Sequence, residues 1–197
     1  MKRCILILVA FILLRGSSLR AQGQTPFVFS AYGGLFFPGN DHFKDIYQST
    51  NDLLWGFGGA IPFEGTLHLA GDIAFFRSEA FLDPLKDSVA TLEERFIHLG
   101  LLNKAPLGKG FSVRLSGGFN YISIKQKTSS PLVPEQSIEG DKKIGYFGGC
   151  GIENLLEGGH AALFADVVYD YRRSHQKELP GDFGGLRFVL GVQLILY

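Results

Sequence analysis

Apolar residues recur at every second position of this chain in one stretch after another, and this alternation limits the folds that it can adopt. A period of two is typical of β-strands with one apolar face, whereas an amphipathic helix repeats every 3.6 residues. We count eight such stretches, each close to or slightly above the ~9–11 residues that a tilted strand needs to cross a bilayer. They are residues 26–37, 53–62, 66–76, 92–102, 111–124, 142–154, 160–172 and 185–197. The sequence therefore predicts an all-β protein.

The connections between these stretches alternate in length. Four are long and polar: residues 38–52, 77–91, 125–141 and 173–184. Three are short: residues 63–65, 103–110 and 156–159. A meander joined in this way has all its long loops at one end and both termini at the other, which is the plan of outer-membrane barrels with short periplasmic turns. The pattern predicts an eight-stranded antiparallel up-and-down transmembrane β-barrel.

Alternation alone leaves open a soluble lipocalin-like carrier, whose apolar face lines a ligand cavity. The two faces differ in composition. The apolar face carries large side chains, such as those of Phe29, Phe57 and Leu190, and almost no charge. The other face carries small residues and scattered charges. Small residues suit the narrow inside of an eight-stranded barrel, while a face in water would carry many Lys and Glu side chains. The composition favours a barrel whose apolar face meets lipid.

Aromatic residues on the apolar face support this interpretation, because they gather toward the strand ends. Two such girdles are typical of rings at the headgroup boundaries of a bilayer. Near the long loops they are Phe37, Trp55, Phe75, Tyr121, Tyr146, Tyr169, Tyr171 and Phe188, and near the turns Phe27, Phe63, Phe111 and Tyr197.

The N-terminal stretch has the layout of a secretory signal peptide. A basic start precedes an apolar run from Cys4 to Leu14, which is too short to span a bilayer comfortably, and small and polar residues follow. We place cleavage after Ala21, with residues 16–18 as a competing site, so that residues 1–21 form the signal peptide. The barrel domain then covers residues 22–197.

The predicted mature chain has a formal charge of −4, from 15 basic and 19 acidic residues, because residues 1–21 include four basic residues and no acidic one. No basic block survives, which argues against a nucleic-acid partner. Cys150 is then the single cysteine, so we expect no internal disulfide.

Three segments of the sequence resemble small outer-membrane barrels of the OmpA/OmpX type, and more closely the Bacteroidetes-type outer-membrane β-barrel domain of the PorT-like family. They are Phe96 to Lys104, Gly110 to Gly118 and the ending Gly191 to Tyr197. The resemblance covers nearly all of the mature chain. It implies location in the bacterial outer membrane, and it implies that the barrel-insertion machinery reads the C-terminal strand with its terminal aromatic, Tyr197.

Charged residues on the inward face are the first candidates for chemistry. They are His68, Asp72, His98, Arg114, Glu153, His160, Asp166, Asp170, Arg172 and Arg187. We interpret them mainly as a structural network, because charges buried in a sealed barrel must be paired. No metal-binding or phosphate-loop motif occurs, and we expect no metal and no cofactor.

Ser174 and His175 form a second candidate, because lipid A deacylase barrels place a His-Ser pair near their final strands. Here His175 precedes Gln176-Lys177-Glu178, unlike the Ser-Asn-Ala run of those enzymes, so we interpret the pair as part of a polar loop. We therefore assign no catalytic or metal-binding residue, and the binding residues of the long loops stay unknown.

The sequence thus predicts a monomeric outer-membrane barrel without enzymatic activity. Its expected role is structural or in surface interactions through four long extracellular loops. The alternatives are a lipid A-modifying enzyme and a soluble ligand carrier. A narrow channel is disfavoured, because eight strands leave little free lumen.

Overall fold

The computed structural model of the chain describes residues 26–39, 52–81, 88–130, 133–140, 144–175 and 180–197. The predicted signal peptide, residues 1–21, lies outside these residues. In the part of the chain that is described, no helix is long and apolar enough to cross a membrane.

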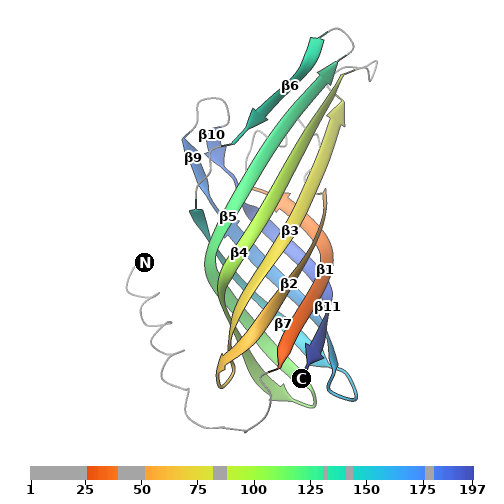
Figure 1. The fold of residues 1–197 in the computed structure, drawn as a ribbon, viewed down its shortest axis with the longest axis vertical. Helices are drawn as coiled ribbons and strands as arrows, with labels where there is room; N and C mark the ends of the chain where they lie inside the picture. Colours follow the sequence, from red (N-terminus) through yellow and green to blue (C-terminus); the bar gives the residue numbers. More distant parts are fainter. Residues whose placement is uncertain (1–25, 40–51, 82–87, 131–132, 141–143, 176–179) are drawn as a thin grey trace.

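The described residues form strands joined by turns and loops (Figure 1). The strands are β1 (Phe27–Pro38), β2 (Asp52–Glu64), β3 (Leu67–Phe81), β4 (Val89–Gly108), β5 (Phe111–Ser130), β6 (Val133–Glu139), β7 (Ile144–Leu155), β8 (Ala161–Tyr171), β9 (Arg173–His175), β10 (Pro180–Asp182) and β11 (Gly185–Leu196).

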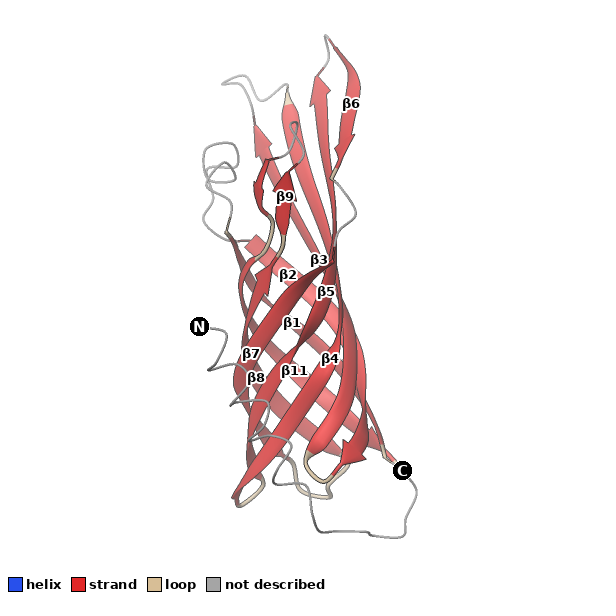
Figure 2. Cartoon of the chain, turned by 90° about the vertical axis from the view of Figure 1, so that its left-hand side faces the viewer, coloured by secondary structure: helices blue, strands red, loops and turns tan. Residues whose placement is uncertain are grey.

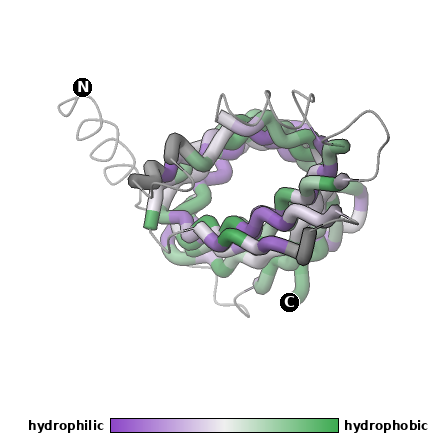
Figure 3. Tube along the Cα trace, turned by 90° about the horizontal axis from the view of Figure 1, so that it is seen from above, coloured by the Kyte–Doolittle hydropathy of each residue, from purple (hydrophilic) through white to green (hydrophobic). Residues whose placement is uncertain are grey.

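Eight of these strands form a closed antiparallel ring, as the view along its axis shows (Figure 3). Their order around the ring is β1, β2, β3, β4, β5, β7, β8 and β11. Strand β11 closes the ring against β1 over their full lengths, from Phe27 opposite Leu196 to Pro38 opposite Gly185. The predicted eight-stranded antiparallel barrel is confirmed.

The two faces of the strands are also as predicted. In β1 the side chains of Phe27, Phe29 and Leu35 are exposed on the outside, whereas Val28 and Phe36 are buried inside. Cys150 is exposed at the middle of β7, on the outward face that the alternation assigned to it. The barrel therefore carries its large apolar side chains outward.

Several connections predicted as loops are strands instead. Residues 77–81 and 89–91 extend β3 and β4, and residues 125–130 extend β5. The predicted short connection 103–110 is mostly strand, because β4 continues to Gly108. Polar residues such as Lys125 and Lys127 led us to expect loops here, but cross-strand pairing continues through these stretches, and Ala80 and Ala90 are buried in them.

The extended strands rise above the rest of the barrel wall on one side only (Figure 2). The last pair between β2 and β3 is Leu54 with Phe76, so beyond Phe76 strand β3 pairs with β4 alone. We call residues 77–81, 89–93, 125–130 and strand β6 the projecting sheet. Another predicted loop, 173–184, contains the β9–β10 hairpin. The end of the barrel that bears these features is its loop end.

The opposite end, here the turn end, holds the three short turns. Left-handed residues allow the chain to reverse tightly there: Gly158 and Gly159 have φ angles of 93° and 74°. Strand β1 begins and strand β11 ends at this end (Figure 1). Tyr197 itself follows the end of β11 and is 67% exposed.

The outward apolar belt has a defined upper edge. Toward the loop end, apolar side chains give way to charged ones between Phe75 and Arg77 on β3 and between Ile97 and Arg95 on β4. At about 3.3 Å per residue and a tilt of about 40°, the stretch of β4 from Ile97 to Leu107 rises roughly 25 Å, the height of the apolar band of outer-membrane barrels.

Two inward glycines allow β4 and β5 to approach closely. Gly100 lies opposite Gly118. A Cβ at Gly100 would clash with the carbonyl oxygen of Gly117, and one at Gly118 would clash with that of Leu99. Only glycine fits at these two positions of the lumen wall.

We therefore expect Gly100→Val to destabilise the barrel by about 1–3 kcal/mol or more, because the added side chain overpacks against backbone. The control is Gly148→Val on the outward face, where an added Cβ would meet no atom within 4 Å. The urea midpoint of the folded protein in detergent measures the difference. Equal midpoints for the two variants would contradict the close approach.

Candidate functional site in the barrel lumen

A cluster of polar side chains crosses the middle of the lumen. We call it the middle cluster; its members are Tyr32, Asp72, His98, Asn120, Asp170 and Arg187. Asp72, His98 and Asn120 are cross-strand neighbours on β3, β4 and β5, so their side chains share the inward face. Asp170 on β8 and Arg187 on β11 reach them from the other side of the ring.

His98 is the centre of this cluster. Its Nδ1 lies 3.0 Å from Oδ1 of Asp72, and its Nε2 lies 2.7 Å from Oδ1 of Asp170. Nε of Arg187 lies 2.7 Å from Oδ2 of Asp170, and the Asn120 amide donates to Oδ1 of Asp170 at 2.9 Å. Each carboxylate therefore has more than one polar partner, as burial requires.

A second group, the lower cluster, lies nearer the turn end. Arg114 contacts two carboxylates: its Nε lies 2.9 Å from Asp166 Oδ1, and its Nη1 lies 2.7 Å from Glu153 Oε2. Lys104 Nζ lies 2.8 Å from Glu153 Oε2 and donates to Gln193 Oε1 at 2.8 Å. Two cations thus face two carboxylates, so this layer is balanced in charge.

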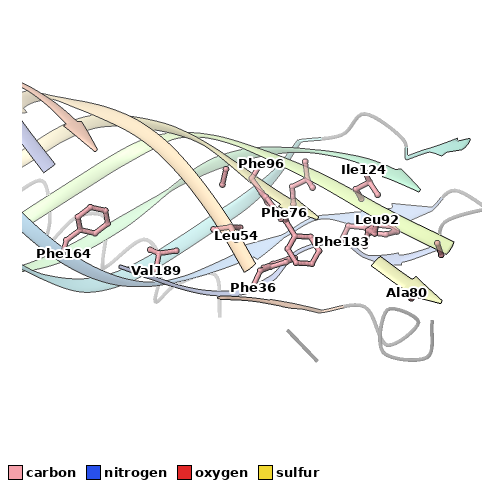
Figure 4. Packing of buried hydrophobic residues seen from close by; sticks show 13 residues of the cluster. Phe36, Leu54, Phe76, Ala80, Leu92, Phe96, Ile124, Phe164, Phe183 and Val189 are labelled. Atoms are coloured by element: carbon pink, nitrogen blue, oxygen red, sulfur yellow. The ribbon is translucent and has the colours of Figure 1, made fainter. Parts of the chain in front are cut away.

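Apolar side chains close the loop end of the lumen (Figure 4). The Phe36 ring packs edge-on against Phe76 and Phe96, with centroids 4.9 and 5.1 Å apart. Phe183, just after the β9–β10 hairpin, joins them, and the backbone N–H of Phe183 donates to the Arg172 carbonyl at 2.8 Å. We call this cluster the aromatic plug; its other members are Leu54, Ala74, Ala80, Ala90, Leu92, Ile122, Ile124, Val189 and Phe164. Phe164 lies farther from the loop end, where its ring centroid is 4.4 Å from the guanidinium carbon of Arg114 (Figure 4).

Little space is left between these layers. A cavity of about 80 Å³ lies among Asp72, Arg114, Asp166 and Arg187. Pockets that hold small organic ligands measure roughly 300–1,000 Å³. The cavity has room for a few water molecules, so its geometry does not favour a soluble ligand carrier.

Most of the inward charges predicted from sequence belong to these clusters. Asp72, His98, Asp170 and Arg187 meet in the middle cluster, and Arg114, Glu153 and Asp166 meet in the lower one, so their predicted pairing across the lumen is confirmed.

The remaining predicted residues lie elsewhere. Arg172 is buried beside the plug, with its guanidinium carbon 5.8 Å from the Phe183 ring centroid. His68 sits near the turn end, where its Nδ1 lies 3.1 Å from the Thr66 carbonyl oxygen. The inward placement of His160 is wrong: it lies in the exposed turn before β8, and its ring packs edge-on against Tyr197.

Sequence reasoning missed Lys104, Glu94 and Gln193. Lys104 was placed in a turn because the predicted strand ended at residue 102, whereas β4 continues past it. Glu94 and Gln193 have the inward phase of their strands and are buried, so the period of two was a sufficient signal for both.

The deacylase candidate is only partly described. Ser174 and His175 lie in β9, where Ser174 pairs with Gly181 and His175 with Pro180. Their side chains are outside the described part of the structure, so no contact bears on a catalytic role.

Comparison with known proteins bears on the fold. No family model matches the chain, and no curated protein matches it either. Among solved structures, Ail, the attachment invasion locus protein of Yersinia pestis, crystallised with the heparin analogue sucrose octasulfate, aligns with a TM-score of 0.60. The identity is 13%, over 87% of this chain and 97% of Ail.

Two further solved structures agree. Neisserial surface protein A aligns with a TM-score of 0.59 at 10% identity, over 86% of this chain and 96% of its own. A major outer membrane protein from Thermus thermophilus aligns with a TM-score of 0.54 at 14% identity, over 86% of this chain and 99% of its own.

The chain has the fold of a small outer-membrane β-barrel. Identities this low establish the fold alone. The resemblance to the OmpA/OmpX type is thus confirmed at the level of architecture, whereas the assignment to the PorT-like family stays a prediction.

The lower cluster gives a direct test of the lumen. We expect Arg114→Leu to lower the free energy of unfolding by about 3–5 kcal/mol, because it removes the ion-pair partner of Asp166 and leaves Glu153 with Lys104 alone. Lys127→Leu, in the projecting sheet, serves as the control. Urea midpoints in detergent measure both, and a midpoint for Arg114→Leu as high as that of the control would mean that Arg114 is solvated.

Proposed function

We propose that the chain is a monomeric protein of the bacterial outer membrane with a structural or interaction role at the cell surface. It acts through the projecting sheet and the long loops. Outer-membrane lipid is its immediate partner, and no nucleic acid or cofactor takes part.

One observation carries this proposal, namely the inverted distribution of polarity. Charged side chains such as Asp170 and Arg187 are buried in the lumen, whereas Leu99, Leu190 and other large apolar side chains are exposed around the outside. In water such a surface would aggregate, because soluble monomers rarely expose apolar patches of more than a few hundred Å². In a bilayer it matches the hydrocarbon core.

Because the lumen is filled by side chains, a function on the outer surface of the barrel is favoured over transport through it. The aromatic plug and both polar clusters occupy the barrel interior, so transport through it has little support. The projecting sheet adds a surface of paired strands at the loop end. Rigid strands present side chains more reproducibly than loops do, which suits a surface that contacts other molecules.

The orientation of the barrel can be tested with single cysteines in a Cys150→Ser background. Glu79→Cys in the projecting sheet should react with a membrane-impermeant maleimide on intact cells. Glu157→Cys in a short turn should react only after the outer membrane is permeabilised, because that turn faces the periplasm. Cys150 in the unaltered chain should react only after denaturation.

The reverse labelling pattern would contradict the proposed orientation. Labelling of all three positions in a soluble fraction would contradict outer-membrane location itself.

We further propose that the barrel-insertion machinery recognises strand β11. Leu196 pairs with Phe27 at the end of the closing seam, and the ring of the following Tyr197 packs against His160 at a centroid distance of 5.6 Å. Without the end of this strand, an edge of the sheet is left unpaired during insertion, and hydrocarbon does not tolerate such an edge.

Deletion of Leu196-Tyr197 should therefore impair assembly in cells more than the lost burial explains, which is at most ~1.5–3 kcal/mol for each side chain. The measurement is the fraction of compact, heat-modifiable protein on unboiled detergent gels. As a control, His160→Ala removes the ring contact with Tyr197 and keeps the strand. Wild-type insertion of the truncated chain would contradict the assembly role.

A further inference from the structure

The outer wall of the barrel has a hollow outside both polar clusters of the lumen, although Phe76 of the aromatic plug and the buried Glu94 contribute to its lining. It measures about 430 Å³ and lies on strands β2 to β5, at the upper edge of the apolar belt. The residues that matter here are Trp55, Phe75, Arg77, Glu93, Arg95 and Lys125. The hollow is thus apolar on the side of the belt and charged on the side of the projecting sheet.

Strand register places these residues in two rows. Trp55, Phe75 and Arg95 are successive cross-strand partners on β2, β3 and β4. One step toward the loop end, Arg77 lies opposite Glu93, and Glu93 lies opposite Lys125. Neighbours on one face of a sheet are close enough for their side chains to contact a common ligand.

The lower row consists of two stacked aromatic rings and an arginine whose guanidinium group lies over one of them. The Trp55 and Phe75 rings stack with centroids 4.6 Å apart, and the Arg95 guanidinium carbon lies 5.4 Å from the Phe75 centroid. Trp55 is 58% exposed. Rings of this kind sit at the boundary between hydrocarbon and headgroups, so Arg95 lies at headgroup depth.

The charges of the hollow are only partly neutralised by the protein. Arg77 pairs with Glu79 at 2.5 Å, and Lys125 Nζ lies 3.7 Å from Glu139 Oε1. These pairs are exposed, and such pairs contribute little energy and exchange readily. Among the described residues, no carboxylate forms an ion pair with Arg95, and Glu93 is the acid that faces the cations from the adjoining row.

We propose that this hollow binds the phosphate of an anionic membrane lipid, with Arg95 as the main cation and Arg77 and Lys125 as its supports. The inference rests on the proposed location of the barrel in a membrane. The apolar side of the hollow accommodates the first part of an acyl chain, and the guanidinium group of Arg95 donates to the phosphate oxygens. Glu93 weakens the binding by repulsion.

Trp55 provides the assay, because it is the only tryptophan of the chain and lies in the hollow itself. The full mature chain is folded into phosphatidylcholine vesicles that contain either brominated phosphatidic acid or brominated phosphatidylcholine at the same mole fraction. Bromine quenches a nearby indole. At low salt, the apparent affinity near Trp55 should be about threefold or more higher for the brominated phosphatidic acid.

Three variants assign the preference to the hollow. Arg95→Gln should lower the apparent affinity for brominated phosphatidic acid to near that for brominated phosphatidylcholine. Glu93→Gln should raise the affinity for brominated phosphatidic acid. Lys109→Gln removes one positive charge at the turn end and should leave the preference for phosphatidic acid unchanged. Unlabelled diphosphorylated lipid A should displace the brominated phosphatidic acid. Heat-modifiable mobility on unboiled gels verifies that each variant is folded.

The failures of the two proposals are distinguishable. A chain that folds into vesicles but is quenched equally by both brominated lipids would overturn the lipid site and leave the membrane location intact. A preference that Arg95→Gln and Lys109→Gln lower equally would also overturn the site, since it would reflect net charge alone. A chain that fails to insert would overturn the membrane location and the lipid site together.

Discussion

The pairing of β1 with β11 is the contact on which the rest of the structure depends. Hydrocarbon offers no hydrogen-bond partner to a free backbone N–H or C=O group, so an open sheet of these strands could not lie in a bilayer. Closure satisfies both edges at once, from Phe27 opposite Leu196 to Pro38 opposite Gly185. It also creates an enclosed interior, and every inward side chain must then find its partners within the ring.

The inward side chains find their partners in separate layers along the lumen. The lower cluster balances two cations against two carboxylates, the middle cluster surrounds His98 with Asp72 and Asp170, and the aromatic plug is apolar, although Ser78, Glu94 and Arg172 are buried next to it. Removal of one member of a polar layer costs more than the pair contributes, because the remaining charge stays buried. The polar layers therefore fix a single arrangement of strands and hold their own charged groups in ion pairs.

Much of this architecture could be predicted from the sequence, because a period of two does not depend on context. It predicted the eight ring strands, both faces and the inward placement of Arg114 and Arg187 among carboxylates. The strand lengths could not be predicted in this way. Lys125 and Lys127 are polar on a face that no longer meets apolar surroundings, and only pairing with β4 and β6 shows that they are strand. The plug was missed for a related reason. Phe36, Phe76 and Phe96 have the inward phase, but composition had suggested a lumen lined by small residues and charges.

The plug is built mainly from strand residues. Phe36, Leu54, Phe76 and Phe96 belong to the ring itself, and Phe183 follows the β9–β10 hairpin. The permeability barrier is thus largely independent of the connections above it. Substitutions or insertions in those connections can therefore occur without removing most of the side chains that fill the lumen.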